Sequence, residues 1–164
     1  MTASEYQYMG GEQYLEEILR QAIRFEEESY ALYRDAIKST PIADAAAMLE
    51  DLAAQELAHK KKLQRLQEQG VSDLAPMVKT SEAQDLKLVD YLQVPAELDA
   101  GADLQDVLLL AMQREKSTRE FYLKLNDLTD DGQAKALFAL LAEEELQHKN
   151  RVEALYENLV YQEF

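Results

Sequence analysis

The sequence predicts an all-α protein, a bundle of four long helices built from two similar helix pairs. Composition is the first reason: the 164 residues include only five glycines and three prolines, and alanine, leucine, glutamate, glutamine and lysine are abundant, which favours helices. Apolar residues also recur every three or four positions over long stretches, as on the buried face of a helix. Finally, the sequence repeats itself without a gap.

The repeat is marked by the only two histidines of the chain, His59 and His148, which lie 89 residues apart (148 − 59 = 89). The same shift superimposes further identical residues of the two halves, among them Glu26 on Glu115, Tyr33 on Tyr122 and Glu56 on Glu145. The chain therefore contains a duplicated helix pair.

In the first pair, the apolar stripe predicts a helix over Gly11–Lys38. Thr40 followed by Pro41 has the pattern of a helix N-cap and a proline at the first helical position, so the second helix is expected to begin there. That helix should continue to about Gln69, where Gly70 ends it.

A long connection with a short helix near Ser81–Leu92 is expected to follow, then a third helix over Asp103–Leu128 and a fourth capped by Thr129 or Asp130. Four helices with one long middle connection predict an up-down, crossover, up-down bundle in a single domain, residues 1–164. The expected units are the two helix pairs and their crossover, at about residues 11–70, 103–162 and 71–102.

Composition excludes several classes of function. The formal net charge of −15 argues against nucleic-acid binding, which requires basic patches. Without cysteine, the chain has no disulfide, no thiolate nucleophile and no cysteine-ligated metal. No apolar run is long enough to span a membrane, and the N-terminus lacks a basic region followed by an apolar one, so we expect no secretory signal and a cytoplasmic protein.

Each histidine follows a glutamate by three residues, which places Glu56 and His59, and likewise Glu145 and His148, on one face of a helix. One further glutamate in each half lies on the buried stripe, so that four carboxylates and two imidazoles converge at mid-helix. Burying an ionised carboxylate in a dry core costs several kcal/mol of folding free energy unless the carboxylate is paired or bound to a cation. This ligand set predicts a dinuclear metal site, for which iron, manganese, zinc and cobalt are all suitable.

Other glutamates lie off the apolar stripes and are expected to be solvated: Glu27, Glu28, Glu143 and Glu144.

Two sequence patterns resemble those of rubrerythrin-like proteins in the ferritin-like superfamily. Ala-x-x-x-Glu-x6-Tyr occurs at residues 22–33 and again at 111–122, and Leu-Ala-x-x-Glu-x-x-His at 52–59 and at 141–148. The resemblance extends over about residues 15–160. It implies a ferritin-like fold and a non-haem di-iron centre.

By this resemblance, Glu56 and Glu145 would bridge the two irons. Each iron would be completed by a glutamate and a histidine of one half, the two sets being Glu26 with His59 and Glu115 with His148. Manganese or zinc are alternatives to iron.

The resemblance also implies that Tyr33 and Tyr122 assist catalysis by hydrogen-bonding the ligand carboxylates; simple aromatic packing is the alternative. Typical rubrerythrins carry one more glutamate a turn after the third-helix ligand, whereas this chain has Thr118 there and Ser29 at the repeat position. We therefore expect a symmetric centre whose metals keep the same ligands in both oxidation states. The two hydroxyls would line the pocket, or merely let helices approach.

The favoured function is an enzyme that reduces hydrogen peroxide or dioxygen at the di-iron centre. The alternatives are a ferroxidase or iron-handling protein and, less favoured, a bundle that holds metal for stability. Because a rubredoxin-type domain would need cysteines, the electron donor is expected to be a separate protein. The long crossover could let helix pairs exchange between chains, so we expect a homodimer.

Overall fold

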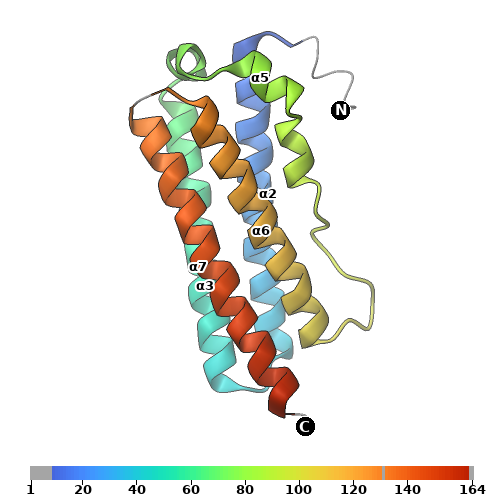
Figure 1. Ribbon diagram of the computed structural model, residues 1–164. Helices are drawn as coiled ribbons and strands as arrows, with labels where there is room; N and C mark the ends of the chain where they lie inside the picture. Colours follow the sequence, from blue (N-terminus) through green and yellow to red (C-terminus); the bar gives the residue numbers. More distant parts are fainter. Residues whose placement is uncertain (1–8, 131, 163–164) are drawn as a thin grey trace.

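The computed structural model describes residues 9–130 and 132–162. Its four long helices are α2, α3, α6 and α7, at Gly11–Ser39, Ala43–Glu68, Leu104–Leu128 and Gln133–Gln162 (Figure 1). The described residues contain no β-strand, only a single antiparallel bridge between Val78 and Thr129. The predicted all-α class is confirmed.

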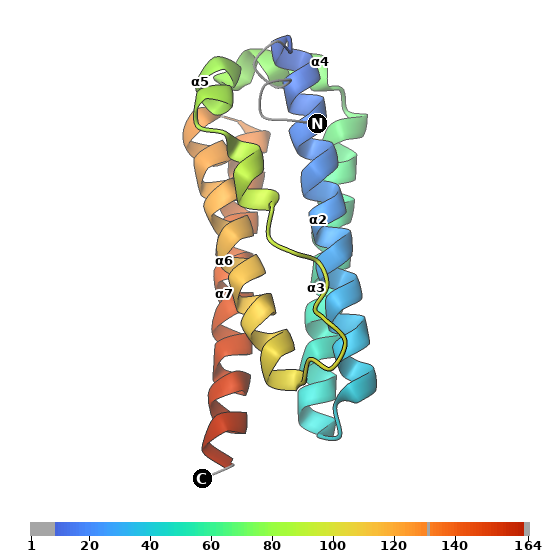
Figure 2. The same ribbon diagram turned by 90° about the vertical axis from the view of Figure 1, so that its right-hand side faces the viewer.

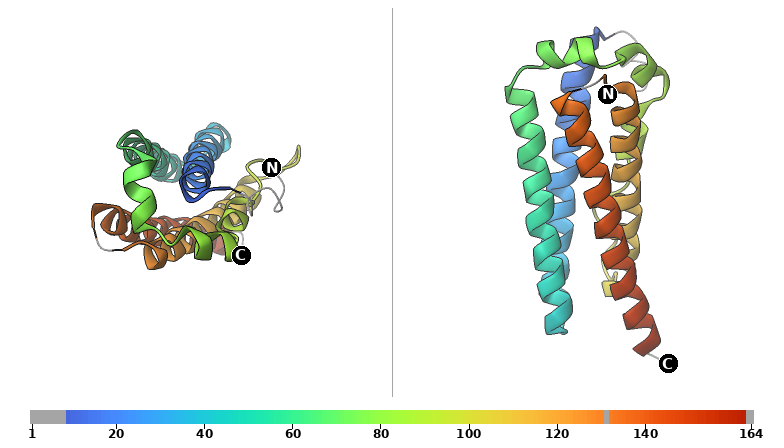
Figure 3. Two further views of the ribbon diagram at one scale, coloured as in Figure 1. Left: turned by 90° about the horizontal axis from the view of Figure 1, so that it is seen from above. Right: turned by 60° about the vertical axis from the view of Figure 1, so that its left-hand side comes forward.

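The long helices pack as two antiparallel pairs, α2 with α3 and α6 with α7. Viewed from above, the four helices surround one common interior (Figure 3). The crossover returns the chain from one end of the bundle to the other, so that α3 and α6 run in the same direction (Figure 2). This is the predicted up-down, crossover, up-down arrangement.

The crossover contains more structure than the sequence suggested. It begins with α4 (Val71–Leu74), the 3-10 helix η1 (Ala75–Met77), α5 (Thr80–Asp85) and a second 3-10 helix, η2 (Leu88–Leu92). The single helix expected near Ser81–Leu92 is wrong, because Lys87 adopts a left-handed conformation with φ of 49° and separates α5 from η2. The remaining residues run extended along the bundle beside α2 and α6 (Figure 2).

Both predicted N-caps after the first helix of each pair are wrong, and for the same reason. The Thr40 hydroxyl donates to the carbonyl of Ala36 at 2.7 Å, and the Thr129 hydroxyl donates to the carbonyl of Leu125 at 2.5 Å. Each threonine therefore closes the last turn of the preceding helix instead of starting the next. As a result α3 begins at Ala43 and α7 at Gln133.

The other predicted helix ends agree with the structure. Asp103 caps α6, since its carboxylate accepts from the amide of Asp106 at 3.0 Å. Gly70 follows the end of α3 with φ of 107°, a conformation that glycine adopts at little cost.

Two apolar clusters fill the interior, one towards each end of the bundle. The cluster nearest the crossover helices includes Phe25, Phe121 and Phe138, while the other includes Leu49 and Leu108. Each large apolar side chain buried in this way contributes about 1.5–3 kcal/mol to folding. Between the clusters lies a layer of buried glutamates and histidines.

None of the helices in the described residues is long and apolar enough to cross a membrane.

Candidate metal centre

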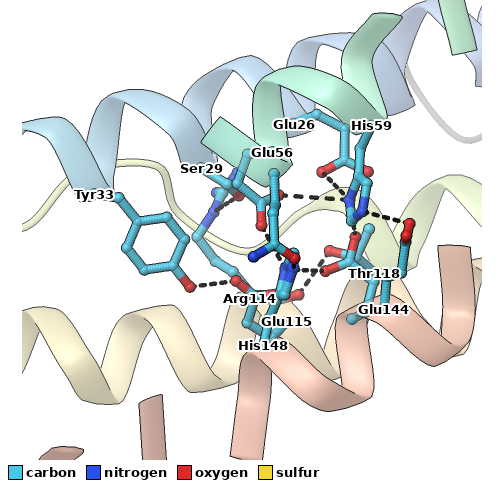
Figure 4. Close-up of polar contacts among 12 residues, drawn as sticks. Glu26, Ser29, Tyr33, Glu56, His59, Arg114, Glu115, Thr118, Glu144 and His148 are labelled. Carbon is cyan, nitrogen blue, oxygen red and sulfur yellow. Dashed lines mark hydrogen bonds and ion pairs between the residues drawn. The ribbon is translucent and has the colours of Figure 1, made fainter. Parts of the chain in front are cut away.

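The six predicted ligands come together in the interior of the bundle, and Figure 4 labels all of them except Glu145. Each of the four long helices contributes a carboxylate, and α3 and α7 also contribute a histidine. All six side chains are at most 3% exposed: Glu26, Glu56, His59, Glu115, Glu145 and His148. The i, i+3 spacing on α3 and α7 directs each Glu-His pair to the same interior face, as the sequence predicted.

The Nδ1 atom of His59 faces three carboxylates. It lies 3.0 Å from Oε1 of Glu145 and 3.9 Å from Oε2 of both Glu26 and Glu56. The imidazole therefore presents Nδ1, and not Nε2, to the interior.

His148 repeats this arrangement from the other half. Its Nδ1 lies 2.7 Å from Oε1 of Glu56 and 3.5 Å from Oε2 of both Glu115 and Glu145. The two imidazole rings stack with centroids 5.1 Å apart and planes 11° from parallel. Glu56 and Glu145 thus lie within 4.0 Å of both histidines.

Four of these residues already form a cluster that could hold a metal ion. One ligand atom from each of Glu56, His59, Glu145 and His148 lies within 4.8 Å of the others. The two Glu-x-x-His segments therefore meet in one cluster, and metal binding by this cluster stays a prediction.

Several buried atoms of the site have no hydrogen-bond partner in the part of the chain that the structure describes. They comprise one oxygen of each carboxylate and one ring nitrogen: Glu26 Oε2, Glu56 Oε1, Glu115 Oε2, Glu145 Oε2 and His148 Nδ1. Some lie close together, but their geometry does not form hydrogen bonds. A buried polar atom left without a partner costs about 1–3 kcal/mol. All five atoms are metal-ligand types, so the donor set fits cations bound between them.

Without cations, the carboxylates cannot all ionise. Burial, reinforced by neighbouring carboxylates, raises the pKa of Glu56 to about 7 and raises the pKa values of Glu26 and Glu145 well above 4.5. Burial acts in the same direction on Glu115, but its close contacts with Glu145 and His148 outweigh burial and lower its pKa. For His148, the close carboxylates outweigh burial and raise the pKa. Bound cations would take the place of the protons that these carboxylates and imidazoles otherwise hold.

The tyrosines bond across the repeat. Tyr33 of α2 donates to Oε1 of Glu115 on α6, and Tyr122 of α6 donates to Oε1 of Glu26 on α2. Burial and the adjacent carboxylates raise both tyrosine pKa values, so the phenols remain protonated donors. Each half of the chain therefore orients a carboxylate of the other half.

The outer nitrogens of the histidines also have partners, which the sequence interpretation missed. His59 Nε2 lies 3.0 Å from Oε2 of Glu144, which also accepts from Lys62 at 2.7 Å; these bonds hold the pKa of Glu144 down to about 2. His148 Nε2 lies 2.8 Å from Oε1 of Gln55. Glu144 is therefore not a solvated residue as predicted. The repeat is the signal that could have found both, since 144 − 55 = 89.

Arg114 is a second missed residue. It is 1% exposed and its guanidinium lies 3.6 Å from the centroid of the Phe25 ring. It donates to Oγ of Ser29 at 3.0 Å, to the carbonyls of Val94 and Pro95 at 3.0 and 2.8 Å, and to the carbonyl of Phe25 at 2.9 Å. The Arg114 side chain therefore links the backbone of the crossover to α2 through hydrogen bonds. Its place three residues after buried Ala111 on the α6 stripe is the sequence signal for its burial.

Two further expectations need adjustment beside this arginine. Glu28, expected to be solvated, has a side chain only 28% exposed and accepts from Arg114 Nη2 at 3.4 Å. The hydroxyls of Ser29 and Thr118 are both engaged with Arg114, since Thr118 donates to the Arg114 carbonyl at 2.8 Å. Glu27 and Glu143 are exposed, as predicted.

Comparison with known proteins identifies the second helix pair. Residues 106–163 match the family model described as Rubrerythrin. This part of the chain is similar to rubrerythrin. The match covers about a third of the chain and includes Glu115, Glu145 and His148. The first half of the chain lies outside the match and is related to the matched part by the 89-residue repeat. Neither a search of curated proteins nor a search of solved structures gave a match. Together with the buried glutamate–histidine cluster, the match suggests a di-iron carboxylate protein.

Proposed function

We propose that the six residues bind two iron ions and that the protein is an oxidoreductase that reduces hydrogen peroxide or dioxygen. One observation carries the proposal: the two oxygens of Glu56 face different histidines, and so do those of Glu145. Glu56 Oε1 lies 2.7 Å from His148 and its Oε2 3.9 Å from His59. Glu145 Oε1 lies 3.0 Å from His59 and its Oε2 3.5 Å from His148. A carboxylate that bridges two metals needs this disposition.

Glu26 and Glu115 have the disposition of terminal ligands. In each, Oε2 faces a histidine, at 3.9 Å for Glu26 with His59 and at 3.5 Å for Glu115 with His148. In each, Oε1 accepts a tyrosine hydroxyl. These contacts support the division into two bridging and two terminal carboxylates.

Two bound ferrous ions would supply the two electrons that reduce hydrogen peroxide, with two protons, to two molecules of water. The residues of the chain provide the setting for this chemistry. The apolar clusters on both sides exclude bulk water, which strengthens electrostatic interactions within the site. Tyr33 and Tyr122 fix the terminal carboxylates and keep a proton at each phenol oxygen, so we assign them the supporting catalytic role.

Other parts of the proposal rest on the sequence alone. These 164 residues contain no cysteine, so a cysteine-ligated iron site that delivers electrons would have to lie on another segment or protein. We expect a separate electron-donor protein, a cytoplasmic location and a homodimer.

The deciding experiment begins with metal analysis of protein purified without added metal. The protein is then loaded anaerobically with two ferrous ions per chain and mixed separately with peroxide and with dioxygen, and the ferric absorbance is followed. We expect rapid oxidation of both irons, retention of both, and repeated turnover when a reductant is present.

Each other outcome overturns this assignment in favour of an alternative. Oxidation of many added ferrous ions per chain with release of ferric iron would indicate a ferroxidase. Tightly bound zinc or manganese without any redox reaction would indicate a structural metal bundle. Glu27→Ala, a change at an exposed acid, is the control that should leave every result unchanged.

A further inference from the structure

We propose that Glu144 and Gln55 make the two metal positions unequal, so that the position beside His59 binds a divalent cation more tightly and fills first. The inference rests on the proposed dinuclear centre but goes beyond it, because the resemblance predicts six ligands in two equal sets. It assigns positioning roles to two residues that do not face the cations.

The two residues occupy the same place in the repeat. Glu144 precedes Glu145 on α7 and bonds the outer nitrogen of His59 on α3, at 3.0 Å. Gln55 precedes Glu56 on α3 and bonds the outer nitrogen of His148 on α7, at 2.8 Å. One histidine is therefore supported by a carboxylate and the other, in the matching place, by an amide.

The chemical difference acts through the imidazole ring. A histidine that binds a cation through Nδ1 carries its hydrogen on Nε2 and donates it outward. A carboxylate accepts this hydrogen more strongly than an amide oxygen, since a charge-assisted hydrogen bond is roughly twice as strong as a neutral one. The stronger acceptor makes Nδ1 more basic, and outer partners of this kind change metal affinity by about 10- to 100-fold.

Charges further out preserve the inequality. Glu144 is paired with Lys62, which reduces its effect without removing its direct contact with His59. On the other side the nearest carboxylate is Asp51, which accepts from Gln55 Nε2 at 2.8 Å, pairs with Arg151 and has a side chain 58% exposed. The carboxylate behind His148 is thus one residue further away and more fully hydrated.

The surroundings nearer the cations are matched in the two halves. Each terminal carboxylate accepts one tyrosine hydroxyl, and both histidine side chains are 1% exposed. Arg114 breaks the repeat, but its guanidinium interacts with both Glu26 and Glu115. Glu144 and Gln55, which contact the two histidines directly, are therefore the partners that differ between the halves.

Because the chain has two histidines, the filling order can be observed directly. Apoprotein labelled with ¹⁵N at histidine is titrated with Zn²⁺, and the two Nδ1 resonances, assigned with His59→Gln and His148→Gln, are followed by NMR. We expect the first equivalent to shift Nδ1 of His59 and the second to shift Nδ1 of His148, with affinities at least about tenfold apart.

Three variants test the cause. Glu144→Gln should bring the two affinities together, and Gln55→Glu alone should strengthen the His148 position. The double exchange, Glu144→Gln with Gln55→Glu, should reverse the filling order. Glu143→Gln, a change at the exposed neighbouring glutamate, is the matched control and should leave the order as it is.

Each contrary result has a distinct meaning. If both resonances shift together in the wild-type protein, or if His148 shifts first, the inequality is refuted. If the order is unequal but survives the double exchange, Glu144 and Gln55 are not its cause and the inference is overturned. If two equivalents of Zn²⁺ shift neither resonance, the proposed metal centre itself fails, and the inference with it.

Discussion

The two halves of the duplicated chain agree in the residues that face the metal centre and differ in the residues behind them. Towards the centre, the glutamates, histidines and tyrosines of α2 and α3 are repeated on α6 and α7 at a spacing of 89 residues. Behind it, Phe25 corresponds to Arg114, and Gln55 corresponds to Glu144. The repeat therefore specifies which groups converge, whereas the residues that support these groups from behind differ between the two halves.

The two sides of the bundle differ accordingly. On the side of α2 and α6, the crossover runs along the helices and Arg114 binds its backbone at Val94 and Pro95 (Figure 2). On the side of α3 and α7, the outer partners of the histidines are half-buried side chains, Gln55 and Glu144. One side of the site is thus enclosed by polypeptide, and the other is limited by side-chain contacts.

The largest expected effect separates bridging from terminal carboxylates. Glu56→Ala or Glu145→Ala should reduce bound metal from two ions towards one or none per chain, because each residue would contact both ions. Glu26→Ala and Glu115→Ala should each weaken one position. The bundle should stay folded, since removal of a buried, repelling carboxylate offsets the lost ligand. Metal analysis after anaerobic loading measures this, with Glu27→Ala as control, and full occupancy in Glu56→Ala would contradict the bridging role.

His59→Ala should likewise lower the metal content towards one ion or none while the helical circular dichroism is retained. Loss of the helical signal at 25 °C would show that His59 is required for folding rather than for metal binding.

Arg114 is buried, so it should contribute more to the free energy of unfolding than an exposed arginine does. Arg114→Met keeps the side-chain length but leaves the buried carbonyl of Phe25 and the carbonyls of Val94 and Pro95 without their donor, so we expect a loss of about 3 kcal/mol in the free energy of unfolding. Urea denaturation of the metal-free protein measures the change. Arg24→Met is the matched control, because the Arg24 side chain is 80% exposed and should change stability by less than about 0.5 kcal/mol. Equal effects of the two changes would rule out the structural role of Arg114.

Much of the fold and the inner site could be predicted because both depend on periodic patterns. Glu26 and Glu115 fall on apolar stripes, so burial follows from their position in the helix, and the repeat pairs each with its counterpart. The two threonines, Thr40 and Thr129, were assigned wrongly because a threonine hydroxyl can cap the following helix or close the preceding one. The local sequence does not distinguish these bonds.

The outer partners could not be predicted from helix periodicity alone. Glu144 lies at the edge of the buried face of α7, and only the approach of α3 brings His59 and Lys62 to it. The same holds for Arg114, whose partners lie on α2 and on the crossover. Such contacts depend on how the helices pack together, which a stripe of apolar residues does not specify.

Tyr33 and Tyr122 should affect metal affinity equally, and less than the ligands themselves do. Tyr33→Phe removes the hydrogen bond to Glu115, and Tyr122→Phe removes the bond to Glu26, so each should weaken metal binding by about tenfold. Competition with a chelator measures the affinities. Tyr161→Phe, at a residue 76% exposed on α7, is the control. If Tyr33→Phe and Tyr122→Phe bind metal as tightly as the wild-type protein, the tyrosines serve packing alone.

The smallest expected effect is a difference in pH dependence between metal-free and metal-loaded protein. The pKa of Glu56 is raised to about 7 in the folded state, and those of Glu26 and Glu145 are also raised, so the folded apoprotein binds more protons than the unfolded chain above pH 4.5. Its stability should therefore fall as the pH rises from about 4.5 through 7. Bound cations remove these protons and should abolish the decline. Urea denaturation across this range tests both forms; an apoprotein that gains stability over it would contradict the assigned shifts.

The central claim is that the two half-sites form one dinuclear centre, and anomalous diffraction from crystals loaded anaerobically with ferrous iron tests it most directly. We predict two iron peaks per chain, about 3.5–4 Å apart, with Glu56 and Glu145 contacting both. Glu26 and His59 should contact one iron, and Glu115 and His148 the other. A single peak, or two peaks without a shared carboxylate, would contradict the account.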